Sequence, residues 1–313
     1  MLGFVLRRLL ATVPVLATVA LLVFLMLRLT PGDPAAIMAG ENATAAQIAE
    51  IRTKLGLDQP ILIQFAIWLS KVLQGDLGES FFFKTPVATL IGQRIGPTIA
   101  LATTTMLLTV LIAVPLGTLA AWRHGTLLDR FVMGFSVLGF SVPVFVLGYA
   151  LIYVFAIRLG WLPVQGYKPL SAGLGPFLAQ LALPSCALAV IYVALVARIT
   201  RASLLEVLGE DHVRTARAKG LKESAVLLRH GLRNAAVPIV TVIGLGIALL
   251  IGGVVVTESV FNIPGLGRLT VDAVLGRDYP TIQGVILVFS GLYVLINLLI
   301  DLLYTLLDPR IRY

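Results

Sequence analysis

The residues that could do chemistry are concentrated in one polar, basic insert, residues 200–238, TRASLLEVLGEDHVRTARAKGLKESAVLLRHGLRNAAVP. The chain has no G-x-x-x-x-G-K-[ST] phosphate loop, no H-E-x-x-H and no G-x-S-x-G. His124, His212 and His230 lack the spacing of metal ligands, so we expect no metal site. A polar insert between two long apolar stretches, without a reaction centre, indicates a surface presented to another protein.

Two further positions carry ionisable groups close to apolar stretches. Glu258 ends the fifth stretch beside a PGLG turn, where either a gate or substrate contact or a capping or pairing role is expected. Asp301 follows Asn297 by four residues and shares its helix face. An ionisable group in a span suggests function, but the nearby Arg310 and Arg312 favour structural pairing for Asp301.

The elements that must position these residues are apolar helices. The chain of 313 residues is 58% apolar and 13% charged. A helix needs about 20 apolar residues to cross about 30 Å of hydrocarbon, and lipid does not tolerate unpaired backbone groups. We therefore expect an all-α polytopic membrane protein with six transmembrane helices. The six uncharged stretches are 9–27, 95–122, 131–157, 169–197, 234–257 and 279–300.

Within these stretches a few residues suggest local detail. The first stretch is longer than a signal-peptide core and lacks a cleavage site, so it is read as an uncleaved anchor. The single cysteine, Cys186, is expected to be a small buried apolar side chain. Prolines that remove backbone donors indicate kinks at Pro115, Pro143, Pro184 and Pro238.

The distribution of basic residues predicts the orientation of the chain. One set of connections, 1–8, 123–130, 198–233 and 301–313, holds 14 basic residues in 65 positions. The other set, 28–94, 158–168 and 258–278, holds 10 in 99. The positive-inside rule therefore places the first set, including the polar insert and both termini, in the cytoplasm. The net charge of +8 needs no nucleic acid to explain it.

The first outer segment, 31–94, is too long for a plain connection. Thr44 and Gln47 suit a capping box, and Gly56 fits the end of the helix after it. A second helix is expected from Pro60 to Gly75. The segment is thus predicted to form a small helical cap, which could serve as a contact surface, an entrance lid or a cover for helix ends.

In the polar insert, the fourth span is expected to continue to Leu208 and to end at Gly209, with Glu210 or Asp211 capping the next helix. This short helix, over 211–219, is predicted to stop at Gly220, and a second helix over 222–232 to return to the bilayer. Short helices are marginal alone, so the first needs a partner, either its own bundle or another protein. Val213 and Ala216 would supply its small apolar edge.

The segment VRTARAKGLKESAVLLRHGLRNAAVP resembles the Glu-Ala-Ala loop of ABC importer permeases, in the form found in peptide permeases. Thr215, Ala216 and Arg217 stand where that triplet is found in other members. RRLL, TPGDPA, GDLGES, ESVFNIPGLGRL with RDYP, and NLLIDLLYTLLDPRIRY also resemble the first permease of dipeptide, oligopeptide and nickel importers. The resemblance covers essentially the whole chain in order.

This resemblance implies a type I ABC importer permease (MetI-like) fold with an extra N-terminal helix and a small periplasmic helical cap. In the family the short helix docks in a cleft of the ATP-binding subunit. The implied coupling residues here are Val213, Arg214, Thr215, Ala216, Arg217, Ala218, Lys219, Gly220 and Leu221. Implied partners are a second homologous permease, two ATP-binding subunits and an extracytoplasmic substrate-binding protein, with ATP and Mg²⁺ held by the partners and no cofactor in this chain.

The expected organisation is a membrane anchor (1–30), an extracytoplasmic helical segment (31–94), a transmembrane core (95–305) that includes the coupling loop 200–234, and a cytoplasmic tail (306–313). The expected function is a non-enzymatic permease subunit in the bacterial inner membrane that translocates peptides, or alternatively nickel, glutathione or another small solute. A self-contained secondary transporter or channel is a second hypothesis, although the span centres hold no charged residue. An intramembrane enzyme is a third, with few groups to support it.

Overall fold

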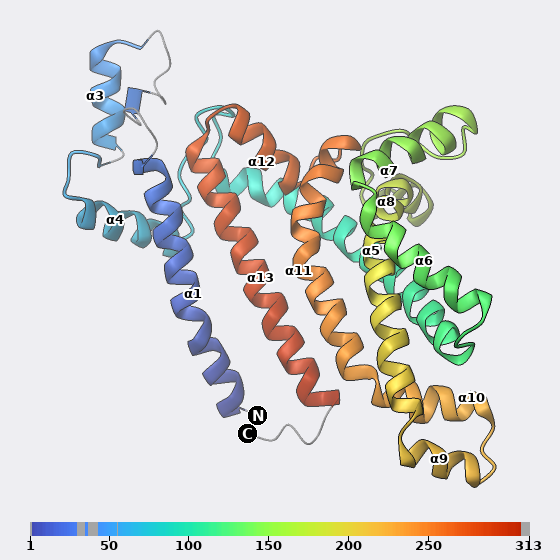
Figure 1. Cartoon of the computed structure of the whole chain (residues 1–313). Coiled ribbons are helices and arrows are strands. Elements are labelled where there is room, and N and C mark those ends of the chain that lie inside the picture. Colours follow the sequence, from blue (N-terminus) through green and yellow to red (C-terminus); the bar gives the residue numbers. More distant parts are fainter. Residues whose placement is uncertain (1, 30–34, 37–42, 55, 308–313) are drawn as a thin grey trace. The chain divides into compact units, whose positions relative to one another are not determined.

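The computed structural model describes residues 2–29, 35–36, 43–54 and 56–307, and the described chain is almost entirely helical (Figure 1). The α-helices are α1 Leu2–Leu29, α3 Ala45–Lys54, α4 Ile61–Leu73, α5 Val87–Trp122, α6 Leu127–Ser141, α7 Val144–Leu151, α8 Leu174–Leu208, α9 Asp211–Ala218, α10 Glu223–Ala225, α11 Ala236–Val260, α12 Leu266–Leu275 and α13 Tyr279–Leu307. Shorter helical stretches are the π-helical η1 Ile152–Arg158 and η3 Val226–Leu232, and the 3-10 turn η2 Leu170–Ala172.

The chain divides into two compact units. Unit 1 comprises Met1–Gly96 and Arg268–Leu295, and unit 2 comprises Pro97–Gly267 and Ile296–Tyr313. Each unit therefore combines segments that are far apart in the sequence. The division of the chain into anchor, outer segment, core and tail stays a prediction.

Unit 1 is held together by polar contacts between its early and late segments. On α13, the amide of Gln283 donates to the Val23 carbonyl of α1 at 2.8 Å. The hydroxyl of Ser80 donates to Asp278 Oδ2 at 2.5 Å, and that of Thr281 donates to the same oxygen at 2.6 Å. These side chains are buried, so their mutual hydrogen bonds remove the cost of leaving polar groups unpaired.

The helical cap predicted for the outer segment is confirmed at the level of its helices. The Thr44 and Gln47 side chains make the reciprocal capping box, with Gln47 Oε1 accepting from the Thr44 amide at 2.8 Å and Thr44 Oγ1 accepting from the Gln47 amide at 3.3 Å. Gly56 and Gly75 follow α3 and α4 with φ of +63° and +83°. Only glycine adopts such values at little cost, which is why both helices end there.

Unit 2 is built around α8. In the apolar 18-residue stretch of α8, 61% is buried, whereas in the corresponding stretch of α11 the buried share is 33%. Helices α6, α7 and α11 all pack against it. Two glycines allow close packing: a Cβ at Gly139 of α6 would lie 2.9 Å from Ala194 Cβ, and one at Gly117 of α5 would lie 2.5 Å from the Ala197 carbonyl oxygen. Small residues let membrane helices approach closely, as they do here.

Among the described residues, five helices are long and apolar enough to cross a membrane, and a sixth span is present if one bent pair counts as one. That pair corresponds to the uncharged stretch 131–157, for which the sequence predicts a single span. Instead Leu127–Ser141 and Val144–Arg158 meet at an angle of 102°. The cause is Pro143, the N-cap residue of α7, which forces Val142 into an extended conformation and ends α6.

Two other expectations are corrected. Cys186 is exposed on α8, although its neighbours Ser185 and Ala187 are buried. Composition did not reveal this, because the outer face of a membrane helix is as apolar as its packed face. The PGLG segment is only partly a turn, because α12 begins within it, at Leu266, and runs for ten residues.

Candidate functional site

The polar insert begins as the end of α8, returns to the bilayer at α11, and forms a helical hairpin between them (Figure 1). Gly209 is the C-cap residue of α8, α9 comes next, and the chain turns at Gly220 with φ of +75°. The predicted short helix and its glycine stop are confirmed. The predicted second helix is divided between α10 and the π-helical η3, which together cover Glu223–Leu232.

The start of α9 is held differently from the prediction. Glu210 is the N-cap residue, but its side chain makes no capping hydrogen bond. Its Oε2 lies 3.0 Å from Nδ1 of His212, and the Asn234 amide lies 3.0 Å from Nε2 of the same ring. The predicted N-cap position of Glu210 is therefore confirmed, but its carboxylate contacts the His212 imidazole instead of capping the helix. His212 links the two ends of the insert.

The apolar edge of α9 faces its own bundle. Val213 is fully buried and Ala216 is 5% exposed. Of the two partners that the sequence left open for this edge, the bundle itself is the one observed, so these residues anchor α9. They pack in a cluster with Val207, Val226, Ala235 and Ile239, joined by the partly buried Val114, Leu208, Leu232 and Ile243.

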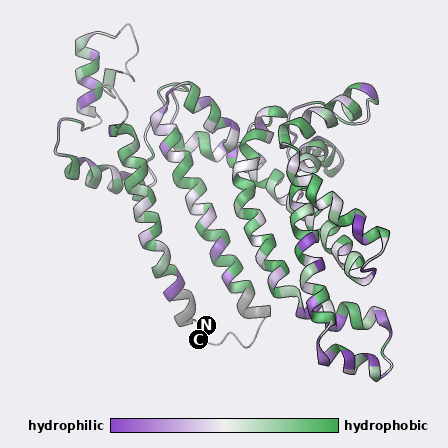
Figure 2. Ribbon diagram, in the orientation of Figure 1, coloured by the Kyte–Doolittle hydropathy of each residue, from purple (hydrophilic) through white to green (hydrophobic). Residues whose placement is uncertain are grey.

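The exposed surface of α9 and of the turn after it is consequently polar and basic (Figure 2). Its exposed residues include every other member of the predicted coupling set: Arg214, Thr215, Arg217, Ala218, Lys219, Gly220 and Leu221. Ala218 and Gly220 have little or no side chain, so the surface between the basic groups is low. Leu221 adds an apolar contact, since its side chain is 43% exposed.

An ion pair closes the turn between α9 and α10. Arg217 Nη2 donates to Glu223 Oε1 at 2.7 Å, and Arg217 Nε donates to Oε2 at 3.3 Å. This bidentate pair lowers the pKa of Glu223 below its usual value, chiefly through the hydrogen bonds from Arg217. The pair spans Gly220 and thereby restrains the glycine turn of the hairpin.

A hydrogen-bond network joins the C-terminal part of α8 to the start of α6 and the connection before it. The sequence analysis did not predict this network. Asp129 is 4% exposed. It accepts hydrogen bonds from the Arg201 guanidinium, from the Gly125 amide at 2.9 Å, and contacts His124 Nδ1 at 3.0 Å. A signal for it existed: Asp129 is the sole acidic residue between Glu79 and Glu206. A lone carboxylate in so long a stretch needs a cation, which Arg201 provides.

Glu258 lies at the opposite end of α11, fully buried in unit 2. Its Oε1 accepts a hydrogen bond from Thr98 Oγ1 at 2.6 Å, and the same Thr98 oxygen accepts from the Leu266 amide at 2.8 Å. A Cβ at Gly265 would overlap the Glu258 carboxyl group. The carboxylate thus connects α5, α11 and the PGLG segment, and this geometry fits the structural pairing that was one of its two predicted roles.

Asn297 and Asp301 lie on α13, both partly buried. Their four-residue spacing places them on one face of that helix, as predicted. The predicted partners Arg310 and Arg312 lie outside the described residues, so the pairing of Asp301 with them stays a prediction. Asn297 and Asp301 are not part of the hairpin formed by α9 and α10. Within the described part of the chain, no three His, Cys, Asp or Glu side chains group as metal ligands would.

Comparison with known proteins places this chain in a family. The family model described as "Binding-protein-dependent transport system inner membrane component" matches residues 113–313, and the model of the N-terminal part of such components matches residues 1–102. The two models together leave only residues 103–112 unmatched, in the middle of α5.

Curated relatives agree over the full length of the chain. A probable peptide ABC transporter permease of Sinorhizobium fredii is 56% identical over 310 residues, covering 99% of each chain. The glutathione transport system permease GsiC of Salmonella paratyphi A is 47% identical over 313 residues, covering 100% of each. A putative peptide transport system permease of Brucella abortus is 44% identical over 314 residues, also covering 100% of each.

A solved structure supports the fold. The inward-facing methionine transporter MetNI contains a chain that matches with a TM-score of 0.59 at 20% sequence identity, over 70% of this chain and 96% of that one. The predicted MetI-like architecture is therefore confirmed, and the N-terminal family model accounts for the additional N-terminal helices. From these matches, this chain belongs to the family of binding-protein-dependent transport system inner membrane components, the membrane permeases of ABC transporters.

Proposed function

We infer that this chain is the membrane-spanning subunit of an importer that carries peptides and is driven by ATP hydrolysed on separate subunits. The observation that carries this proposal is full-length identity of 56% and 44% to two permeases named for peptide transport. The chain itself has no G-x-x-x-x-G-K-[ST] loop, which supports a transport subunit without its own ATPase site.

Glutathione is the second candidate substrate, because a relative named for glutathione transport is 47% identical over the whole chain. Glutathione is itself a short peptide, so a permease cavity that admits one can admit the other. An external substrate-binding protein would then decide between them. Spans rich in aliphatic and small residues offer few polar groups for selection, which supports that division of labour.

The proposed docking site for the ATP-binding subunit is the exposed face of α9 from Arg214 onward, together with the turn Lys219–Leu221 that follows it. Val213 and Ala216 fix α9 to the bundle, and the Arg217–Glu223 pair restrains its turn. A helix held in this way transmits a displacement of its partner to α8 and α11. ATP can shift the transporter between its outward-open and inward-open states only through a partner that binds the two states differently.

The proposed assembly contains this chain, a second homologous permease, two ATP-binding subunits and an extracytoplasmic binding protein. Both termini and the α9–α10 hairpin are proposed to face the cytoplasm. The support is the roughly twofold greater density of basic residues in the connections on that side.

A matched pair of charge reversals tests the docking proposal. Arg214→Glu changes the proposed contact face, whereas Arg229→Glu makes the same change at an exposed position of η3 in the same hairpin. We expect Arg214→Glu to lower ATP-driven uptake in proteoliposomes at least tenfold and to weaken copurification of the ATP-binding subunit. Arg229→Glu should leave both near the wild-type level. Equal behaviour of the two variants would contradict the assignment of this face.

The substrate proposal is tested with the reconstituted complex and its binding protein. Titration of the binding protein with di- and oligopeptides, glutathione and a nickel chelate should show the tightest binding for a peptide. Uptake by proteoliposomes should require the binding protein and ATP. Uptake driven by an ion gradient in liposomes that hold this chain alone would instead support a self-contained secondary transporter.

A further inference from the structure

Helix α4 is strongly apolar, yet none of its residues is buried in the protein. Ten of its thirteen residues, ILIQFAIWLSKVL, are apolar, and none of the thirteen, all of which the structure describes, is buried. Leu62 and Leu73 are 80% and 79% exposed. The preceding helix α3 is polar by comparison (Figure 2). An apolar helix of a cap that faced only water would bury its apolar stripe.

The length of α4 limits what it can do in a membrane. Thirteen residues make a helix of about 20 Å, well short of the roughly 30 Å of the hydrocarbon core. Apolar helices of this length are either packed inside a core or lie at the membrane interface. The exposure of α4 excludes the first arrangement.

Contacts within unit 1 fix the level at which α4 lies. It runs across the C-terminal end of α1 (Figure 1). The Phe24 ring of α1 contacts the rings of Phe65 and Trp68, with centroids 5.1 and 5.7 Å apart. Arg28 Nε donates to the Gln64 side chain at 3.1 Å. Arg28 is the first charge after the apolar run of α1, so it marks the boundary between hydrocarbon and headgroups, and α4 lies at that boundary.

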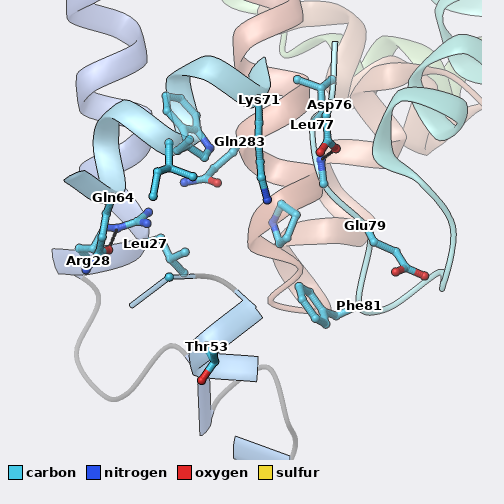
Figure 3. Close-up of a pocket in the computed structure, with 15 residues that line it drawn as sticks. Leu27, Arg28, Thr53, Gln64, Lys71, Asp76, Leu77, Glu79, Phe81 and Gln283 are labelled. Carbon is cyan, nitrogen blue, oxygen red and sulfur yellow. Dashed lines mark hydrogen bonds between the residues drawn. The ribbon is translucent and has the colours of Figure 1, made fainter. Parts of the chain in front are cut away.

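The two sides of α4 differ in polarity. One side borders a cavity of about 280 Å³, and it carries the polar residues Gln64 and Lys71 of α4 together with Ile67 and Trp68 (Figure 3). Other segments contribute Arg28, Asp76 and Glu79 to the same cavity. Away from this cavity, a second side is a stripe of apolar residues at helical spacing. This apolar stripe consists of Leu62, Ala66, Leu69 and Leu73.

We propose that α4 is an interfacial helix that lies in the membrane surface at the C-terminal end of α1, with its apolar stripe in contact with lipid. The candidate membrane span α1, on which α4 packs, also exposes apolar side chains, since Leu21 and Leu22 are 43% and 62% exposed. The cavity side, which carries Gln64 and Lys71, then faces the headgroups. This division is what an amphipathic surface helix requires, and the aromatic residue Trp68 lies at the depth where such residues are enriched.

This proposal does not depend on the substrate or on which side of the membrane α4 occupies, so it can fail independently of the proposed function. The alternative is that the apolar stripe contacts a protein, either a lobe of the binding protein or another subunit. The experiment separates these cases by asking whether lipid reaches the stripe when no binding protein is present.

The test uses the full transporter in liposomes, with Cys186→Ala removing the exposed native thiol. Leu62→Cys and Leu73→Cys are each labelled with the environment-sensitive fluorophore NBD, and both positions are nearly four-fifths exposed, so no buried contact is lost. Ala49→Cys, on an exposed position of α3, is the control. Quenching is measured with lipids that carry a nitroxide at the headgroup or upper acyl chain, and with a water-soluble nickel complex.

We expect the labels at Leu62 and Leu73 to emit at shorter wavelength than the control and to be quenched at least threefold more by the nitroxide lipids than the Ala49 label is. The Ala49 label should be quenched chiefly by the aqueous nickel complex. Two results would overturn the proposal. One is equal aqueous quenching at all three positions, and the other is a blue shift at Leu62 and Leu73 that occurs only after the binding protein is added.

Discussion

At the scale of single residues, Thr98 shows how one hydroxyl connects segments of unit 2 that are 160 or more positions apart in sequence. It donates to the buried Glu258 carboxylate and accepts from the Leu266 amide. A buried carboxylate is costly unless hydrogen bonds compensate it. The Thr98 hydroxyl therefore stabilises both Glu258 and the start of α12.

We predict that Thr98→Val lowers the stability of unit 2 by about 1–3 kcal/mol, because it removes both hydrogen bonds while keeping the shape of the side chain. Thr98→Ser keeps the hydroxyl and should lose much less. The measurement is the thermal denaturation midpoint of the purified complex in detergent. A valine variant as stable as the serine variant would show that the hydroxyl contributes little.

The Arg217–Glu223 pair predicts a pH dependence for the hairpin. The folded-state pKa of Glu223 is lowered, so the pair contributes its stability above the ordinary carboxyl pKa and loses it as the pH falls through the lowered folded value. Both side chains are 42% exposed, and such pairs contribute below about 1 kcal/mol. Wild type and Glu223→Gln should therefore differ slightly in amide hydrogen exchange around Gly220 at pH 7 and converge at acidic pH. A difference that grows on acidification would refute this account.

At the scale of elements, the packing of α6 on α8 depends on a single small residue. Gly139 is buried against Val190 and Ala194, whereas a Cβ at Gly134, one and a half turns earlier on α6, would meet no other atom within 4 Å. The two glycines of one helix therefore differ in what a side chain would contact. The bend at Pro143 adds to this constraint, because α6 and α7 must each pack on α8 separately.

We predict that Gly139→Ala destabilises the complex by about 1–3 kcal/mol, since its Cβ would lie 2.9 Å from Ala194 Cβ and force the helices apart. Gly134→Ala should be neutral or slightly stabilising, because alanine favours helix over glycine. Yields of folded complex and denaturation midpoints compare the two. Similar losses in both variants would mean that backbone flexibility, rather than close packing, explains these glycines.

At the scale of the whole molecule, the distribution of basic residues predicts the orientation of the chain in the membrane. In a Cys186→Ala background, we predict that Lys219→Cys reacts with a membrane-impermeant maleimide only when the cytoplasmic side is accessible. Lys168→Cys, in the second outer connection, should react only from the other side. The two positions have the same exposed residue type in the native chain, which makes the labelling yields comparable. Reaction of both from one side would contradict the predicted topology.

The sequence alone predicted most of the helices and several of their ends. Five of the six uncharged stretches predicted single apolar helices long enough to cross a membrane, because an apolar run of about 20 residues is stable in hydrocarbon. The sixth, 131–157, is instead the pair of helices bent at Pro143. Gly56, Gly75 and Gly220 predicted helix ends, since their positive φ is a local property of glycine. The hairpin of α9 and α10 was recognisable for the same reason, as a polar segment with a glycine turn. Its sequence also resembles known permeases closely enough to indicate the family.

Only the tertiary structure decided which face of each helix is buried. Val213 and Ala216 were predicted to form an apolar edge, and the structure shows that this edge anchors α9 to its own bundle. Cys186 was predicted to be buried and is exposed. In a membrane protein the lipid-facing and the packed surfaces are both apolar, so side-chain type does not distinguish them. The pairing of Asp129 with Arg201 and of Glu258 with Thr98 depends on helix packing between distant segments, which no local pattern encodes.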